Sequence, residues 1–191
     1  MQYGFYFDQS RCTGCYTCLI ACKDWHEYDL GSEPANWIKV NTIEKGKFPD
    51  LFVSFLFSTC LHCANPPCIP GCPIGAITKR EEDGIVVTDR EVCLGIENCE
   101  IVCQAACPYK ALQIGSEPGA KIQKCNLCLH RWAEGKKAIC VEACPMRALD
   151  AGPLEELESK YGEIRAAEGF VYSKDAKPSI VFKLKRQRGS L

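Results

Sequence analysis

The hydrophobic positions of this chain come in short runs, most of them long enough only for strands. Four runs are bounded by polar, glycine or proline residues, as expected of short β-strands. These strand candidates are Tyr3–Phe7, Leu51–Phe57, Ile85–Thr88 and Ile180–Leu184. A further stretch, Leu154–Tyr161, has the charge pattern of an exposed helix that Gly162 would end. No apolar run approaches the roughly 20 residues that span a bilayer.

Cysteine is unusually frequent, at 16 of 191 residues. That density is typical of disulfide scaffolds or of metal- and cluster-binding proteins. It leaves little of the chain for a large apolar core, so metal or disulfide bonds must supply part of the folding free energy. The formal net charge is −1, which gives no reason to expect a nucleic-acid partner.

The cysteines fall into four groups of four, with none left over. All four groups end in C-x3-C, and the last three continue as Cys-Pro-x-x-Ala and an apolar residue. Such tight grouping disfavours disulfides, and the N-terminus shows no secretory signal pattern. The groups are Cys12, Cys15, Cys18 and Cys22; Cys60, Cys63, Cys68 and Cys72; Cys93, Cys99, Cys103 and Cys107; and Cys125, Cys128, Cys140 and Cys144.

The first group, C-x2-C-x2-C-x3-C, has the ligand spacing of bacterial two-cluster ferredoxins. Three thiolates two residues apart let one tight loop surround three irons of a cubane. The fourth cysteine then points toward a neighbouring cluster. We expect short helices to carry or follow the fourth cysteine of each group. The other groups have longer gaps, and the third is stretched to C-x5-C-x3-C-x3-C.

Zinc is the main alternative, because four thiolates form common structural zinc sites. Zinc ribbons, however, pair C-x2-C knuckles and do not call for the repeated C-x3-C-P. The spacing therefore favours iron–sulfur clusters over zinc, and zinc over disulfides. His62, between Cys60 and Cys63, is a further ligand candidate, but we expect it to be a loop residue that hydrogen-bonds near a cluster. Lys110 and Arg147 closely follow fourth cysteines, as solvated charges or as charges that raise a reduction potential.

Two stretches resemble a known family. Tyr3–Asp8 with Ser10–Cys15, and Glu134–Pro145 with Arg147–Asp150, are similar to the iron–sulfur electron-transfer (beta) subunits of the dimethyl sulfoxide reductase family of molybdopterin oxidoreductases. The resemblance implies an α+β fold of two bacterial ferredoxin-like halves in a nested arrangement, with cysteine-free extensions. One half would comprise residues 1–30 and 118–152, and the other residues 54–117. Residues 31–53 would be an insertion and residues 153–191 a C-terminal extension for partner docking.

The resemblance also implies four [4Fe-4S] clusters, each held by three cysteines of one group and the fourth of another. The third group departs from the family's usual C-x2-C-x2-C spacing. The implied ligands are Cys12, Cys15, Cys18 and Cys144 for cluster 1; Cys125, Cys128, Cys140 and Cys22 for cluster 2; Cys60, Cys63, Cys68 and Cys107 for cluster 3; and Cys93, Cys99, Cys103 and Cys72 for cluster 4.

The implied function is that of a non-catalytic electron-transfer subunit. Four clusters would form a wire between a molybdenum or tungsten pterin catalytic subunit and a second redox partner, which is a membrane anchor subunit or a soluble carrier. The alternatives are the same wire serving a tungsten aldehyde oxidoreductase-type or other soluble reductase, and a zinc-stabilised interaction module. We expect no nucleic-acid partner and no transmembrane segment. The location is the cytoplasm, or the far side of a membrane after folded export with a signal-bearing partner; a peripheral membrane position is compatible with both.

Overall fold

A three-stranded sheet joins the first strand of the chain to two strands from its last quarter. The computed structural model describes residues 1–27 and 36–186. Strands β1 (Tyr3–Asp8), β6 (Leu149–Pro153) and β7 (Ile180–Lys183) lie in the order β6–β1–β7. β1 pairs antiparallel with β6, with Phe5 opposite Ala151, and parallel with β7, with Phe5 opposite Ile180. The start of the chain is therefore held on both sides.

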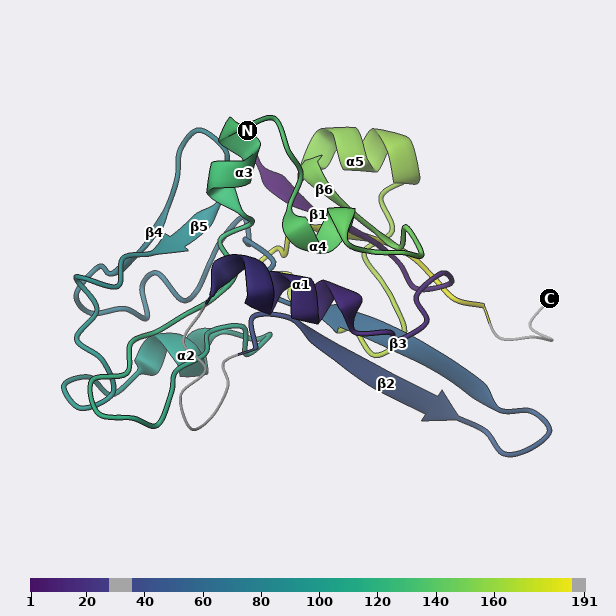
Figure 1. The fold of residues 1–191 in the computed structure, drawn as a ribbon, viewed down its shortest axis with the longest axis horizontal. Helices are drawn as coiled ribbons and strands as arrows, with labels where there is room; N and C mark the ends of the chain where they lie inside the picture. Colours follow the sequence, from purple (N-terminus) through teal and green to yellow (C-terminus); the bar gives the residue numbers. More distant parts are fainter. Residues whose placement is uncertain (28–35, 187–191) are drawn as a thin grey trace.

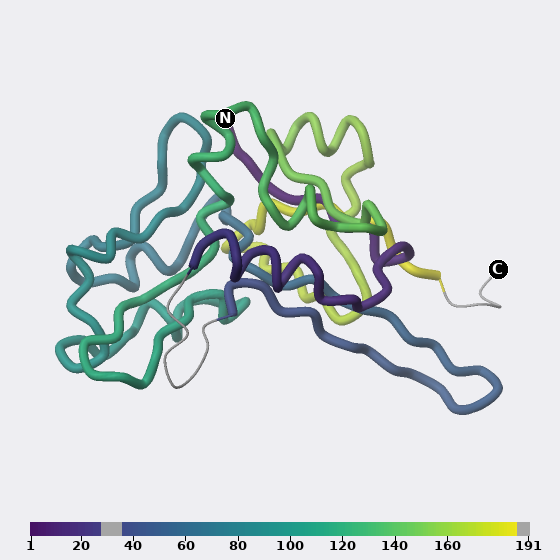
Figure 2. Tube along the Cα trace, in the orientation of Figure 1, coloured from purple at the N-terminus to yellow at the C-terminus, as the bar shows by residue number. Residues whose placement is uncertain are grey.

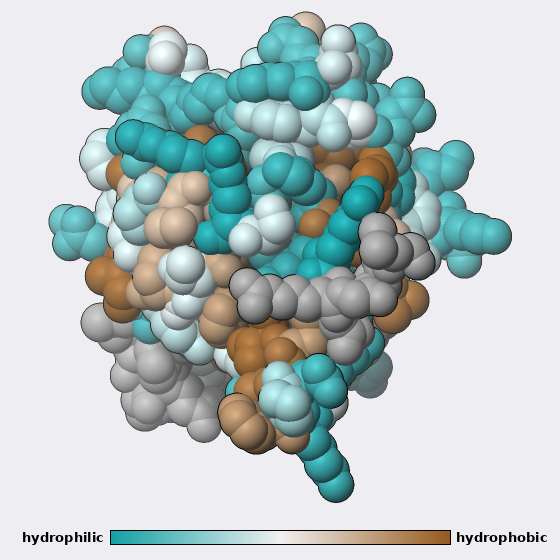
Figure 3. Space-filling model, turned by 90° about the vertical axis from the view of Figure 1, so that its right-hand side faces the viewer, coloured by the Kyte–Doolittle hydropathy of each residue, from teal (hydrophilic) through white to brown (hydrophobic). Residues whose placement is uncertain are grey.

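Two smaller sheets lie outside this one. Strands β2 (Lys39–Lys45) and β3 (Phe52–Ser58) form a long antiparallel hairpin that projects from the body of the molecule (Figures 1 and 2). Strands β4 (Ile77–Lys79) and β5 (Val86–Thr88) form a short antiparallel pair. Viewed from the hairpin end, hydrophilic side chains cover most of the upper half of the molecule, and apolar ones gather lower down (Figure 3).

Five helices connect the strands in the described residues, and most of these helices lie next to cysteines. α1 (Thr17–His26) carries Cys22 and packs against α4 (Ile139–Glu142), which carries Cys140. α2 (Val102–Ala106) carries Cys103, and α3 (Leu129–Ala133) begins directly after Cys128. α5 (Leu154–Tyr161) packs on all three strands of the central sheet. The helices therefore bring segments together that are far apart in the sequence.

The interior is built from aromatic side chains and thiols together. Phe5, Phe7 and Phe182 are almost wholly buried in the main core, which also contains cysteines of groups one, two and four. A second, smaller core surrounds Cys68 and Cys103 with side chains such as Leu112. Buried apolar side chains therefore pack directly around the cysteines in both cores.

The predicted strands are confirmed as β1, β3, β5 and β7, with ends that shift by at most one residue, and the predicted helix is α5 with Gly162 at its end. The prediction for helices at the fourth cysteines holds for Cys22 only. In groups three and four the helix precedes the fourth cysteine, and in group two Cys72 lies between two turns and in no helix. The reason is that a Cys-Pro-x-x-Ala segment forms a tight turn, as described below.

Two segments predicted as appendages form regular structure. Part of the insertion at 31–53 is strand β2, and part of the extension at 153–191 is strand β7 of the central sheet, whose residues Ile180 to Phe182 are fully buried. Residues 28–35 and 187–191, which include parts of both predicted segments, lie outside the described residues.

Candidate functional site

The first C-x2-C segments of groups one, two and four share one backbone feature. The residue directly before the second cysteine has a positive φ, which is 70° at Gly14, 43° at His62 and 54° at Leu127. A left-handed conformation costs an L residue roughly 1–2 kcal/mol, so the loop must impose it. Such turns direct successive backbone N–H groups to one side, where they can meet an anion. In one loop the N–H of Leu127 donates to Cys125 Sγ at 3.3 Å.

The repeated Cys-Pro-x-x-Ala segments form the same turn three times. In each, the residue before alanine donates its N–H to the carbonyl oxygen of the fourth cysteine. The same three donor residues have φ values of 69°, 48° and 51°. The donors and distances are Gly75 to Cys72 at 3.3 Å, Lys110 to Cys107 at 3.1 Å, and Arg147 to Cys144 at 3.2 Å.

This turn supplies a donor to the fourth thiol. The N–H of Ala111 points at Cys107 Sγ, 3.5 Å away, and that of Ala148 at Cys144 Sγ, 3.3 Å away. Hydrogen bonds from backbone N–H groups to the sulfurs are among the features that tune iron–sulfur clusters. The repeated sequence motif therefore corresponds to a repeated N–H donor.

The first predicted ligand set comes together around one cavity, which Cys12, Cys15, Cys18 and Cys144 all line. Burial raises the pKa of Cys18 to about 12, and Cys12 and Cys144 contribute in the same direction. Cys15 is exposed, and its Sγ lies 3.3 Å from the hydroxyl of Thr17, which lowers its pKa. This set reaches the molecular surface at Cys15.

The second set lies between α1 and α4. Burial raises the pKa of Cys140 well above its usual value, and Cys125, Cys128 and Cys22 add to the effect. Burial also raises the pKa of Cys125 to about 12. Beside this set, Nε2 of His26 lies 3.3 Å from Cys128 Sγ.

The remaining thiols form two further neighbourhoods. Burial raises the pKa of Cys63 to about 12 and also raises that of Cys103, and nearby thiols act in the same direction. These nearby thiols are Cys60, Cys107 and Cys68 around Cys63, and Cys72, Cys99 and Cys93 around Cys103. The shared cavity and the mutual pKa effects thus place thiols of each predicted ligand set near one another.

These donors fit iron–sulfur clusters. No disulfide joins any of the sixteen cysteines, so the disulfide alternative is wrong. Cluster iron binds thiolates. Burial and the repulsion between neighbouring thiolates favour the protonated thiols, so binding of iron would release their protons. No three His, Cys, Asp or Glu side chains in residues 1–27 and 36–186 converge closely enough for a single metal ion; this finding concerns one ion and not a cubane.

His62 and Lys124 are buried beside the thiols. His62 accepts a hydrogen bond at Nδ1 from the N–H of Val86, 3.1 Å away, and Nε2 has no hydrogen-bond partner among the described residues. Its hydrogen bond therefore goes to the backbone and not to a thiol.

Sequence reasoning missed Lys124, although it directly precedes Cys125. It is only 3% exposed, and Nζ donates to the carbonyl oxygens of Cys125, at 3.0 Å, and Val86. Burial raises the pKa of Cys68 to about 12, and the charge of Lys124 opposes this shift, as it does at Cys125. A buried cation therefore lies near thiols of two different sets.

No helix in the described part of the chain is long and apolar enough to cross a membrane.

Comparison with known proteins points to one group. The 4Fe-4S dicluster domain matches residues 51–154. The sequence is 44% identical to YnfG, a probable anaerobic dimethyl sulfoxide reductase chain of Escherichia coli K12, and 43% identical to another anaerobic dimethyl sulfoxide reductase chain of the same strain; both alignments cover 95% of this protein and 88% of the relative. It is 32% identical to one of the sulfite dehydrogenase subunits of Allochromatium vinosum, over 83% of this protein and 72% of the relative.

Proposed function

Because the protein is a member of the family of iron–sulfur electron-transfer subunits of dimethyl sulfoxide reductase-type complexes, we propose that it carries electrons through four [4Fe-4S] clusters. The wire runs between a molybdenum or tungsten pterin catalytic subunit and a second redox partner. The observation that supports the proposal is the grouping of the thiols: one predicted set of four lines a single cavity, and thiols within the other sets raise one another's pKa.

The ligation in this proposal is crossed, so that each cluster takes its fourth thiolate from another group. The shared cavity supports cluster 1, and the mutual effects of thiols on pKa support the other three. The proposed ligands are Cys12, Cys15, Cys18 and Cys144; Cys125, Cys128, Cys140 and Cys22; Cys60, Cys63, Cys68 and Cys107; and Cys93, Cys99, Cys103 and Cys72.

We propose the nested two-half architecture on related grounds. Pairing of β1 with β6 and packing of α1 on α4 bring the segments of groups one and four together. The cysteines of the smaller core all belong to groups two and three. These contacts support one half formed by the two ends of the cysteine-containing region and a second half inserted between them.

The effects of thiols on the pKa of thiols in other sets, together with the packing of the smaller core, support a linear order of the clusters. Cys18 of the first set affects the pKa of Cys140 in the second, and Cys60 of the third affects that of Cys125 in the second. Sets three and four share the smaller core. The order is therefore 1–2–3–4. Each cluster, when bound, supplies one-electron chemistry. The protein's part is to hold the thiolates, direct N–H groups toward sulfur and keep water away from the inner sets.

Iron analysis of the native complex tests the count. Four clusters of four irons give 16 iron and 16 sulfide per chain, with zinc near zero. A variant with Cys99→Ser and Cys103→Ser, which removes two ligands of cluster 4, should approach 12. A native value of 12 would show that the stretched third group holds no cubane, and stoichiometric zinc would refute the electron-transfer proposal.

A further inference from the structure

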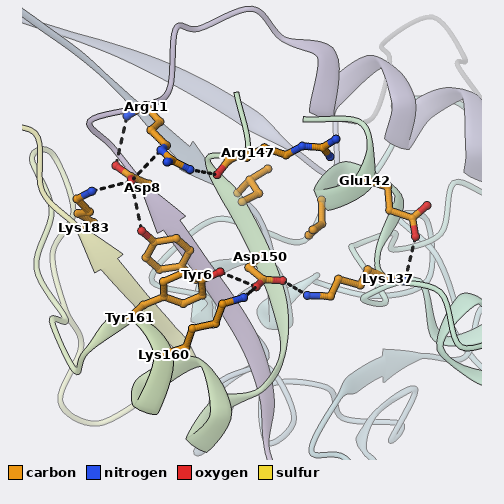
Figure 4. A pocket seen from close by; sticks show the side chains of 12 residues that line it. Tyr6, Asp8, Arg11, Lys137, Glu142, Arg147, Asp150, Lys160, Tyr161 and Lys183 are labelled. Atoms are coloured by element: carbon orange, nitrogen blue, oxygen red, sulfur yellow. Dashed lines mark hydrogen bonds and ion pairs between the residues drawn. The ribbon is translucent and has the colours of Figure 1, made fainter. Parts of the chain in front are cut away.

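A second cavity lies on the surface beside the central sheet and contains none of the thiols. It has a volume of about 570 Å³ and lies among β1, β6, β7, α4 and α5. Its lining includes five cationic and three anionic side chains, together with Tyr6 and Tyr161 (Figure 4). None of these charges takes part in the proposed ligation, so the pocket needs its own explanation.

Two of the three acidic residues form the floor of this basic pocket, whereas the third, Glu142, is exposed and pairs with Arg131. The side chains of Asp8 and Asp150 are only 3% and 8% exposed. Asp8 accepts from the Tyr6 hydroxyl at 3.3 Å, and Asp150 from the Tyr161 hydroxyl at 2.8 Å. Burial alone would raise the pKa of both acids. Hydrogen bonds from Ser10 and Lys183 lower the pKa of Asp8, and those from Lys137, Tyr161 and Lys160 lower that of Asp150. The two tyrosine rings stack 3.6 Å apart, and the lowered pKa values keep both carboxylates of the floor ionised.

The cationic groups stand at the rim, where a partner would meet them. Lys183 and Lys160 reach Asp8 and Asp150 at 3.3 and 3.2 Å, yet their side chains stay 58% and 61% exposed. Arg11 is similarly exposed. Arg147 is also exposed, and its guanidinium makes no ion pair with a described residue. Since positive groups outnumber negative ones by two and face the solvent, the pocket presents a positive potential.

The pocket adjoins the most exposed of the cysteine sets. Leu149 lines both this pocket and the cavity of the first set. Arg11 directly precedes Cys12, and Arg147 follows Cys144 by three residues. A protein bound at the pocket would therefore sit beside the end of the wire at which a thiol reaches the surface.

We propose that the basic pocket docks an acidic segment of a redox partner protein, whose carboxylates pair with Arg147, Lys160 and Lys183. The inference rests on the proposed function and names the chemistry of one partner. Complementary charge would speed encounter and fix the orientation of the partner at the cluster 1 end. Arg147 is the most available contact, because its guanidinium can donate two parallel hydrogen bonds to a carboxylate without giving up an existing ion pair.

The test compares charge reversals in the native complex. We expect Arg147→Glu to weaken association of the partner about tenfold, measured by native mass spectrometry across a salt series. Arg147→Lys should lose less, and Lys174→Glu should leave association unchanged, because Lys174 is an exposed lysine outside the pocket. Carbodiimide coupling should join Lys160 or Lys183 to carboxylates of a neighbouring subunit.

Equal behaviour of Arg147→Glu and Lys174→Glu would overturn the proposal. So would coupling of the pocket lysines only to carboxylates of their own chain, or binding of inorganic phosphate with no acidic protein segment. Iron content separates the two hypotheses, since a chain with 16 irons and no charge-dependent docking would refute the pocket and leave the electron-transfer proposal standing.

Discussion

Replacing Lys124 with methionine removes a buried positive charge from the middle of the proposed wire. The ammonium group is held by the carbonyl oxygens of Val86 and Cys125, and its charge affects the pKa of thiols in the second and third sets. A reduced cluster carries one more negative charge than an oxidised one. Lys124 should therefore stabilise the reduced form of clusters 2 and 3, and its loss should lower both reduction potentials.

The size of the effect follows from Coulomb's law. For a separation of roughly 8 Å and an effective dielectric constant of about 20, the interaction is about 2 kcal/mol. A one-electron couple changes by about 59 mV per tenfold change in equilibrium constant, so this energy corresponds to about 90 mV. Methionine would also leave two buried carbonyl groups without their donor, at about 1–3 kcal/mol each in stability.

Redox titration of the native complex, followed by electron paramagnetic resonance, measures the potentials directly. We expect two of the four clusters to shift by about −50 to −100 mV in Lys124→Met. Lys124→Gln separates charge from packing, because its amide can still donate to a carbonyl oxygen; it should give a similar shift with a smaller loss of stability. Lys121→Met is the matched control, since Lys121 is partly exposed and solvent screens its charge. A shift below about 20 mV, or an equal shift in the control, would refute the reasoning.

Three further changes test the ligation, the loops and the C-terminal strand. Cys22→Ser should convert cluster 2 to a three-iron form, or shift its potential, and leave cluster 1 intact in electron paramagnetic resonance; damage to cluster 1 instead would exclude crossed ligation. Gly14→Ala should speed iron release from cluster 1, because a Cβ there would lie 2.4 Å from the Phe55 ring. Gly75→Ala is its control: Gly75 has a similar positive φ but no atom within 4 Å of the added Cβ, so this variant should lose only the roughly 1–2 kcal/mol of backbone strain. Phe182→Ala should lower the free energy of unfolding by about 3–5 kcal/mol in denaturant titrations; a change below about 1 kcal/mol would mean that this strand serves docking alone.

Local sequence pattern predicted the strands that carry their own apolar residues. β1, β3 and β7 contain continuous or alternating hydrophobic side chains, and the structure has them close to the predicted bounds. β6 was missed because its sequence, LDAGP, has little strand propensity and is held by pairing with β1. β2 was missed because its exposed, charged sequence becomes a strand only against β3. β6 therefore depends on a strand far away in the sequence, and β2 on the next strand of its own hairpin.

The functional features likewise divide into those that a local sequence pattern predicts and those that depend on distant contacts. Cysteine spacing alone indicated cluster binding, because a ligand loop is a local structure. The basic pocket could not be predicted, since Asp8, Asp150 and Lys183 meet only after β1 has paired on both sides. Lys124 gave a weak signal by its place next to Cys125, but its burial depends on β5, which supplies the Val86 carbonyl oxygen.

The one group that lacks the Cys-Pro-x-x-Ala motif shows why the other three have it. In group one the helix α1 continues for four residues beyond Cys22, to His26. A proline at position 23 would remove a helical hydrogen bond and clash with the preceding turn, so lysine stands there. In groups three and four the helix ends before the fourth cysteine, and the chain must turn sharply to direct an N–H group at the thiol. Because α1 continues beyond Cys22, it is long enough to pack along α4, and this packing brings Cys22 close to Cys140. The absence of proline after Cys22 thus allows the packing of α1 on α4, and the proposed pairing of groups one and four depends on this packing.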